Sequence, residues 1–424
     1  MNIYRLPYGQ REISLEIPTG LKTDVIAQAN PVPHPDPLQA VGDALNQPCA
    51  GKRLEDFPIP RRVAIAINDK TRPVPHRALL LPILRRLEQL DVPKSMIKLV
   101  IASGTHDPMR VDEFPLILPQ EMIANHPIAV HDCDQGENLV HLGTSPAGTP
   151  VFVNRDFYEA DLKIVVGNIE PHHFMGFSGG VKTAAVGLGG RETIRRNHAF
   201  ITHPEARLGI YEQNPMRQDV EEIGKMMGVD YAVNAILNEN LELVHAVAGL
   251  PLAVMAAGIP LSRAVCQVPV SGKYDIVVAS CGGYPKDINL YQAQKAQSNA
   301  AMLVKLGGTI ILIAECAEGI GSTGYEEFMR GVQSSQQAIQ KFRQQDFQLG
   351  PHKAYLFARI AQKCETVLVS SIPADVVHTY LLKPAPDVHV ALQYALGRAS
   401  GTASIALMPH AVATAPLVAT SSVA

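Results

Sequence analysis

Three histidines, one lysine and two glycine-rich runs lie in one short segment, residues 170–198, EPHHFMGFSGGVKTAAVGLGGRETIRRNH. Glycine lets backbone amides approach an anion closely. Lys182, which follows Gly179 and Gly180, could neutralise a phosphate or react with a carbonyl group. Histidine can bind a metal or transfer a proton near neutral pH. We therefore expect this segment to carry the chemistry and the rest of the chain to bring other groups to it.

Each reactive residue of this segment has more than one interpretation. GFSGGVK departs from the phosphate loop of nucleotide hydrolases because Val181 precedes Lys182, so Lys182 could be a phosphate contact, a Schiff-base lysine, a covalent tether or an exposed lysine at a helix start. Adjacent side chains on an extended chain point in opposite directions, so we expect His172 to face the site and His173 to have a supporting role. His198 should follow a helix, either as a metal ligand or as a histidine favoured by the helix dipole.

Two further loops follow buried strands. Asp69 and Arg72 lie in NDKTRP after strand 62–67, where the guanidinium could bind a substrate carboxylate or form an ordinary turn ion pair. His106 lies in SGTHDP after strand 97–102, as a general acid/base or as a satisfied loop histidine. Because ligands of parallel sheets bind beyond the carboxyl ends of the strands, we expect these loops to share one site.

A helix expected at residues 290–306 carries Tyr291, Gln292 and Lys295 near its N-terminus. Gln292 and Lys295 are three residues apart and share a face near the helix N-terminus, where anions are favoured. They could contact an anion, or they could form a solvated helix face. His352 and Lys353, in GPHKAY, are expected in a loop. They could face a polar or acidic substrate side chain, or they could lie on the surface.

The bulk composition excludes several classes of function. A net charge of −3 over 424 residues, without long charged runs, argues against nucleic acid or a membrane surface as a partner. No apolar run is long enough to span a membrane, and the N-terminus lacks a signal-peptide core. The six cysteines form no C-x-x-C pair, which indicates free thiols, a cytoplasmic location and no structural zinc.

Alternating strands and helices predict an α/β fold with two domains, largely parallel sheets and an active-site cleft between them. We expect an N-terminal domain over residues 1–262 and a C-terminal domain over residues 263–402. Residues 403–424 could pack back on the first domain. Further predicted elements are a hairpin over 1–18, strands 162–166, 274–280, 309–314 and 366–371, and helices 76–90, 111–126 and 326–343.

The order and spacing of the motifs are more specific than any one of them. DKTRP, SGTH, EPHHF, GFSGGVK, the Asn197–His198 pair and LYQAQK together resemble the nickel-dependent lactate racemase family. Enzymes of that family carry a nickel-pincer nucleotide, a pyridinium mononucleotide with two sulfur-bearing arms. The resemblance spans roughly residues 60–300 and fits both expected domains.

The resemblance implies a role for each candidate residue. Lys182 would tether the cofactor through a thioamide, and His198 would be the protein ligand of nickel. The remaining assignments are acid/base catalysis by His106 and His172, substrate binding by Arg72, Tyr291, Gln292 and Lys295, and cofactor support by Asp69, Thr71, Gly179 and Gly180.

The implied reaction inverts C2 of a 2-hydroxy acid, either lactate or a longer relative, by reversible hydride transfer. The implied partners are that small molecule and the proteins that synthesise the cofactor, and the sequence makes no prediction of oligomeric state. Two alternatives from other classes remain open: a family member that binds a hydroxy acid without turnover, and a lyase that uses Lys182 as a Schiff base.

Overall fold

The computed structural model describes residues 1–28, 30–399 and 401–418. The chain divides into two compact units. The central unit is Asn30–Val265, and the terminal unit combines Met1–Ala29 with Cys266–Ala424. Within the described part of the chain, no helix combines the length and the apolar composition needed to cross a bilayer.

A six-stranded sheet forms the middle of the central unit. Its strands are parallel except for β13 at one edge, which pairs antiparallel with β12. β4 has the sequence VAIAIN and is buried along almost its whole length, as expected for a parallel strand covered on both faces. In spatial order the strands are β13 (Leu243–Gly249), β12 (Tyr231–Leu237), β9 (Leu162–Asn168), β4 (Val63–Asn68), β5 (Ile97–Ala102) and β6 (Ile128–Val130).

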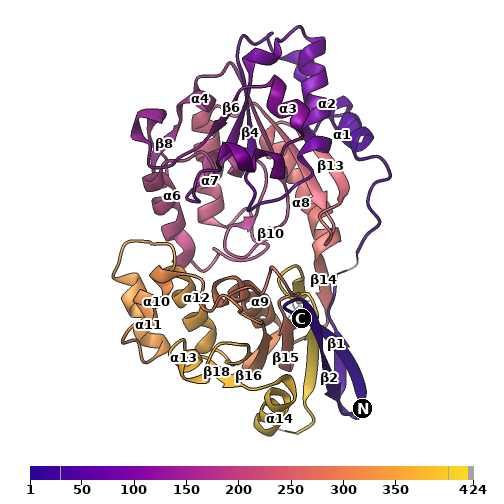
Figure 1. Ribbon diagram of the computed structural model, residues 1–424, viewed down its shortest axis with the longest axis vertical. Coiled ribbons are helices and arrows are strands. Elements are labelled where there is room, and N and C mark those ends of the chain that lie inside the picture. Colours follow the sequence, from indigo (N-terminus) through magenta and orange to yellow (C-terminus); the bar gives the residue numbers. More distant parts are fainter. Residues whose placement is uncertain (29, 400, 419–424) are drawn as a thin grey trace, which may run out of the picture. The chain divides into compact units, whose positions relative to one another are not determined.

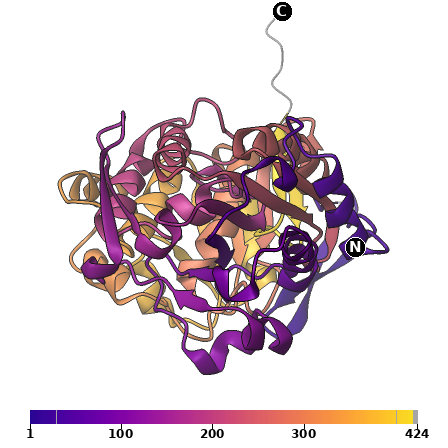
Figure 2. The same cartoon turned by 90° about the horizontal axis from the view of Figure 1, so that it is seen from above.

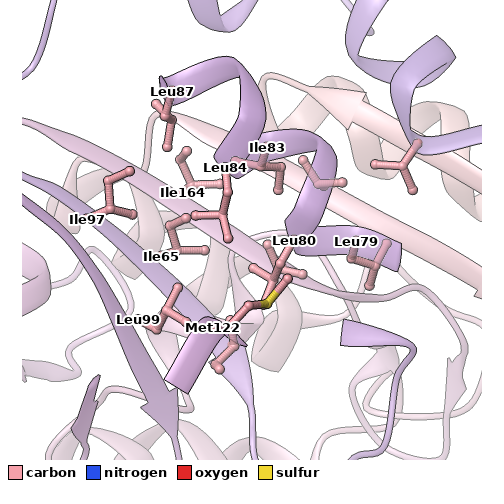
Figure 3. Packing of buried hydrophobic residues seen from close by; sticks show 14 of the residues in the cluster. Ile65, Leu79, Leu80, Ile83, Leu84, Leu87, Ile97, Leu99, Met122 and Ile164 are labelled. Carbon is pink, nitrogen blue, oxygen red and sulfur yellow. The ribbon is translucent and has the colours of Figure 1, made fainter. Parts of the chain in front are cut away.

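Helices cover this sheet, and α2 shows how. Its buried residues recur at helical spacing, and Figure 3 shows Leu80, Ile83 and Leu84 of this helix directed at strand residues such as Ile65 and Leu99. The longer helices of the unit are α1 (Pro37–Asn46), α2 (His76–Gln89), α6 (Arg191–His198), α7 (Pro215–Met227) and α8 (Pro251–Cys266). Shorter elements are α3 (Gln120–Asn125), α4 (Arg155–Tyr158), α5 (Lys182–Ala185) and the pairs β7 (Leu139–Thr144) with β8 (Pro150–Asn154) and β10 (Pro171–His172) with β11 (Gly176–Phe177).

The terminal unit has its own six-stranded sheet, and all its pairings are parallel. In spatial order its strands are β18 (Lys383–Ala385), β17 (Glu365–Val369), β16 (Val304–Ile313), β15 (Tyr274–Ser280), β19 (Ser404–Met408) and β3 (Lys22–Val25). The N-terminal hairpin of β1 (Asn2–Tyr8) and β2 (Arg11–Ile17) contributes Leu6, Leu15 and Ile17 to the core of this sheet. β14 (Gln267–Val270) pairs with β20 (Ala415–Val418). The helices are α9 (Leu290–Leu303), α10 (Thr323–Met329), α11 (Ser335–Arg343), α12 (Pro351–Ala361), α13 (Ala374–His378) and α14 (Val388–Arg398).

The two α/β sheets confirm the predicted fold class, but the domain limits need correction. Residues 1–29 were expected in the N-terminal domain, and they belong to the terminal unit, where β3 pairs with β19. For the last segment, 403–424, the sequence left open whether it packs back on the first domain or frays. Its residues 404–408 form an inner strand of the terminal sheet and pair with β3, so described segments from both halves of the chain belong to that unit (Figure 1 and Figure 2). Residues 419–424 lie outside the described residues.

Several predicted elements also change in detail. The helix expected over 326–343 is two helices, α10 and α11, because a turn containing Gly331 (φ 76°) separates them. The helix expected over 111–126 is a 3₁₀ helix, Val111–Leu116, followed by α3. The GPHKAY segment was expected to be a loop. It instead begins α12, with Gly350 as its N-cap and Pro351 at its first position.

Candidate active site

The loops after β4 and β5 meet through one carboxylate. Asp69 is 2% exposed, and its Oδ2 lies 2.9 Å from Nδ1 of His106. The Thr71 hydroxyl donates to Oδ1 of Asp69 at 2.7 Å. Burial alone would raise the pKa of Asp69, but the hydrogen bonds from His106 and Thr71 outweigh it and leave that pKa below its ordinary value. The carboxylate is therefore ionised at neutral pH.

This contact fixes how His106 can act. An ionised carboxylate only accepts hydrogen bonds, so Nδ1 of His106 carries the proton and Nε2 keeps its lone pair. The His106 side chain is 43% exposed. A partly exposed histidine oriented by a buried carboxylate has the arrangement of a general base.

The segment after β9 holds the second pair of histidines. The rings of His172 and His173 stack, with centroids 4.7 Å apart and planes 13° from parallel. The expectation that they point in opposite directions is wrong, because β10 ends at His172 and the chain turns immediately afterwards. The amide of Met175 donates to Nδ1 of His172 at 3.2 Å, so neutral His172 presents an N–H at Nε2.

Phe174 connects the stacked pair to the third histidine of the segment. Its ring meets His172 and His173 edge-on, at 4.5 and 4.3 Å, and meets His198 at 5.7 Å. Phe174 is 7% exposed. One buried aromatic ring thus separates the residue expected to move protons from the residue expected to bind metal.

His198 was expected to follow a helix. It is instead the last residue of α6. Its Nδ1 lies 2.9 Å from the carbonyl oxygen of Ile194, one turn earlier, so Nδ1 carries the proton. Desolvation lowers the pKa of His198 to about 4, aided by the positive charge of Lys182. His198 is therefore a neutral imidazole with its Nε2 lone pair intact, the form that binds metals.

Lys182 begins α5 at the end of the glycine run. Desolvation, with the positive charges of Arg72 and Arg217, lowers the pKa of Lys182 to about 7. Desolvation also holds the pKa of His172 well below its ordinary value, and Lys182, His173 and Arg72 lower it further. These mutual effects place Arg72, from the first loop, within electrostatic range of the reactive segment.

The glycines before Lys182 serve close packing. Gly179 and Gly180 have φ values of 85° and 56°, and a Cβ on Gly179 would lie 2.5 Å from Ile169 Cγ1. The Gly180 amide donates to Oδ1 of buried Asn234 at 2.7 Å. That amide is therefore occupied by the Asn234 side chain.

Sequence analysis missed the groups that hold this loop. Arg217, which is fully buried, donates to the carbonyl oxygens of Phe177 and Gly179 at 3.3 and 3.1 Å and pairs with Glu221 at 2.5 Å. The spacing of Arg217 and Glu221, four apart on α7, was a visible signal. Nothing in the sequence shows that Asn234, on β12, lies beneath the loop.

The terminal unit carries the remaining candidates. Asn289 caps α9 by accepting from the Gln292 amide at 3.0 Å, which sets Tyr291, Gln292 and Lys295 in the first turns. Lys295 donates to Oε1 of Gln292 at 2.8 Å, which confirms that these two residues share a face. Tyr291, Gln292 and Lys295 thus lie in the terminal unit. The central unit holds Asp69, Thr71, Arg72, His106, His172, Lys182 and His198.

Comparison with known proteins identifies the family. Residues 8–209 match the lactate racemase N-terminal domain, and residues 270–415 match the lactate racemase C-terminal domain. The lactate racemase of Thermoanaerobacterium thermosaccharolyticum is 30% identical over 416 residues, covering 96% of this chain and 97% of that protein. The chain belongs to the lactate racemase family. Its members are isomerases, and the resemblance inferred from the motifs is confirmed.

Other relatives agree with this membership. The lactate racemase of Lactiplantibacillus plantarum is 28% identical, covering 95% of this chain and 97% of that one. The apoprotein structure of the Thermoanaerobacterium lactate racemase superposes with a TM-score of 0.91 at 29% identity, covering 98% of this chain and all of the other. A Thermotoga maritima structure shares the fold, with a TM-score of 0.67 at 17% identity.

Proposed function

We propose that this protein inverts C2 of a 2-hydroxy acid by reversible hydride transfer, using a nickel-pincer nucleotide attached to Lys182. The observation that carries the proposal is the surroundings of Lys182. A lysine with a pKa of about 7 lies within electrostatic range of two histidines that burial keeps neutral. A neutral amine can form an amide-type bond, and neutral imidazole can bind a metal.

The donor groups fit the proposed cofactor. His198 keeps its Nε2 lone pair because Nδ1 is committed to the Ile194 carbonyl. Imidazole nitrogen together with sulfur would suit nickel. Lys182 would supply the attachment through its uncharged amine. When bound, the nucleotide would supply the hydride-accepting and hydride-donating chemistry at C2.

The chain's own residues would position the substrate and move the hydroxyl proton. Arg72 would bind the substrate carboxylate through its guanidinium group. Nε2 of His106 would accept the hydroxyl proton of one enantiomer, because Asp69 stabilises the resulting imidazolium. Nε2 of His172 would handle the proton on the opposite face. Tyr291, Gln292 and Lys295 would complete the binding of carboxylate and alcohol.

Hydride transfer and proton abstraction at carbon can be separated directly. The protein would be co-expressed with the cofactor-synthesis proteins and incubated in deuterium oxide with one enantiomer of the substrate. Chiral chromatography would measure inversion, and mass spectrometry would measure deuterium at C2. We expect inversion with C2 unlabelled, because the hydrogen never exchanges with solvent. Deuterium at C2 of the inverted product would refute the hydride mechanism.

A neutral lysine also suits a Schiff-base lyase, so that alternative needs its own test. Borohydride in the presence of a 2-keto acid would trap a substrate adduct on Lys182 if such a lyase were present. We expect a mass increase of the nucleotide's size on Lys182 and no borohydride-dependent adduct. A holoprotein that binds hydroxy acids but inverts none of them would instead support the non-catalytic binding alternative.

A further inference from the structure

Helix α7 lies against the loop that leads into Lys182. Arg217, Glu221 and Gly224 recur at helical spacing, so they share one face of this helix. A Cβ on Gly224 would lie 2.5 Å from Cβ of Val181, the residue before Lys182. The glycine therefore lets α7 approach the loop closely, on the same face that carries Arg217.

Arg217 and Lys182 use the same backbone acceptor. The Lys182 amide donates to the carbonyl oxygen of Gly179 at 3.3 Å, and Nη2 of Arg217 donates to the same oxygen at 3.1 Å. Nη1 of Arg217 donates to the carbonyl oxygen of Phe177 at 3.3 Å. The guanidinium group thus links two carbonyl groups of the loop just before α5 begins.

Glu221 holds the guanidinium group in this orientation. Its Oε1 accepts from Nε of Arg217 at 2.9 Å and from the Tyr211 hydroxyl at 2.7 Å. The side chains of Arg217 and Glu221 are 0% and 3% exposed. A buried ion pair is costly to desolvate and adds little net stability, whereas the planar arginine fork fixes geometry well. This contrast favours a positioning role for Arg217 over a purely stabilising one.

The charge of Arg217 also acts on the Lys182 amine. Desolvation, together with the positive charges of Arg72 and Arg217, lowers the pKa of Lys182 to about 7. Under the proposed function, the neutral form of this amine makes the bond to the cofactor. Arg217 therefore affects both the position of Lys182 and its ability to react.

We propose that Arg217 is a positioning residue for Lys182, acting through the Gly179 carbonyl group that both residues use and through its own positive charge. The inference rests on the proposed function and deepens it, because it names the group that prepares Lys182 for attachment of the cofactor.

The test measures two properties, acetylation of Lys182 in the cofactor-free protein and nucleotide attachment after co-expression with the cofactor-synthesis proteins. The double variant Arg217→Gln/Glu221→Gln removes the guanidinium group without leaving a buried carboxylate unpaired. We expect the pH of half-maximal acetylation to rise by about one unit, because a positive charge near the amine is lost. The fraction of chains with the mass adduct should fall about tenfold, because the amine is no longer held in place.

Arg217→Lys separates charge from geometry. The lysine keeps the positive charge, so the pH of half-maximal acetylation should stay within about 0.3 units of the wild-type value. A single ammonium cannot replace the planar fork, so the adduct should still fall about threefold. Wild-type attachment in Arg217→Lys would overturn the inference, and this variant decides the question if the double variant does not fold.

Two controls exclude a general loss of stability as the cause. Ile223→Ala removes buried apolar volume from a different face of α7, and Arg207→Gln changes an exposed arginine. Both should keep the wild-type acetylation profile and adduct, even where thermal melting shows a less stable protein.

The remaining outcomes separate this inference from the function on which it rests. An unshifted profile in the double variant, or an equal shift in Ile223→Ala, would overturn the role of Arg217 while leaving the racemase intact. A wild-type protein that never acquires the adduct would refute the proposed function, whereas the acetylation profiles would still decide whether Arg217 controls the Lys182 amine.

Discussion

The loops after β4 and β5 and the segment after β9 place histidines in opposite electrostatic surroundings. His106 is partly exposed and lies against an ionised carboxylate. His172 and His198 are desolvated and lie near the positive charge of Lys182, which lowers the pKa of each. The first arrangement favours a histidine that accepts a proton, and the second keeps imidazole and amine uncharged. The same residue type thus suits proton transfer in one region and bonding to a metal in the other.

The largest expected effect comes from removing the amine of the desolvated region. Lys182→Ala should abolish attachment of the cofactor, because Lys182 is the amine whose charge acts on His198. Intact-mass measurement after co-expression with the cofactor-synthesis proteins would show this loss. Lys225→Ala, at an exposed lysine of α7, should retain the full adduct. Retention of the adduct in Lys182→Ala would show that the attachment lies elsewhere.

The two regions can then be compared through their histidines. His106→Ala and His172→Ala should each lower kcat for inversion about 10²- to 10⁴-fold, because each removes one proton-transfer group. Both variants should keep the mass adduct and nickel, measured by mass spectrometry and metal analysis. His203→Ala, at an exposed histidine, is the control. Normal turnover in either variant would remove that histidine from the acid/base role.

A smaller effect should follow from neutralising the carboxylate behind His106. Asp69→Asn keeps the side-chain size but no longer stabilises the imidazolium, so we expect kcat to fall about 10- to 10²-fold. The loss should be absent when His106 is already alanine, because Asp69 acts through that ring. Asp107→Asn, at an exposed aspartate, should have no effect. Equal losses with and without His106 would contradict the coupling.

The pKa of Lys182 predicts unusual reactivity in the cofactor-free protein. Only the neutral amine attacks an acylating reagent, and its fraction rises with pH through the pKa of about 7. Acetylation of Lys182, followed by peptide mass spectrometry, should therefore reach half its maximal rate near pH 7. In urea-unfolded protein the half-maximal rate of Lys182 should move to higher pH, toward the ordinary lysine pKa of 10.5. A folded-state profile that matches the unfolded one would show that desolvation does not control this amine.

The smallest expected effect is on stability. His76 is 2% exposed, and desolvation lowers its pKa to about 4 from 6.5. Between pH 6.5 and 4 the unfolded chain binds a proton there that the folded chain does not. The free energy of unfolding should therefore decrease as the pH is lowered from 6.5 to 4, by about 1.4 kcal/mol per pH unit for this residue. Urea unfolding of His76→Gln should show a shallower slope, whereas His389→Gln, at an exposed residue, should not.

Much of the fold followed from local pattern. Continuous apolar runs predicted β4, β5, β9 and β15 to within one or two residues, because parallel strands are buried on both faces. The assignment of the chain ends failed for a physical reason. Pairing of β3 with β19 joins residues nearly 400 positions apart, and no local signal encodes such a contact.

In the candidate site, too, local pattern predicted some features, and others depended on long-range contacts. Types and spacing were enough to propose Lys182, His106, His172 and His198 as candidate reactive residues. Spacing did not reveal the ring stacking of His172 on His173, or the burial of Lys353 in α12. Both depend on where the chain turns and on what packs above it.

The sequence by itself determined the family, the α/β class and the residues able to do chemistry, because these are properties of order and composition. Only the tertiary structure decided their states of protonation. The amine of Lys182 loses its proton near pH 7 because distant segments exclude water and bring Arg72 and Arg217 within range. His106 obtains its carboxylate from the loop after β4, 37 residues away. Desolvation and electrostatic interactions depend on which residues come close in the folded chain, so the sequence alone could not predict these protonation states.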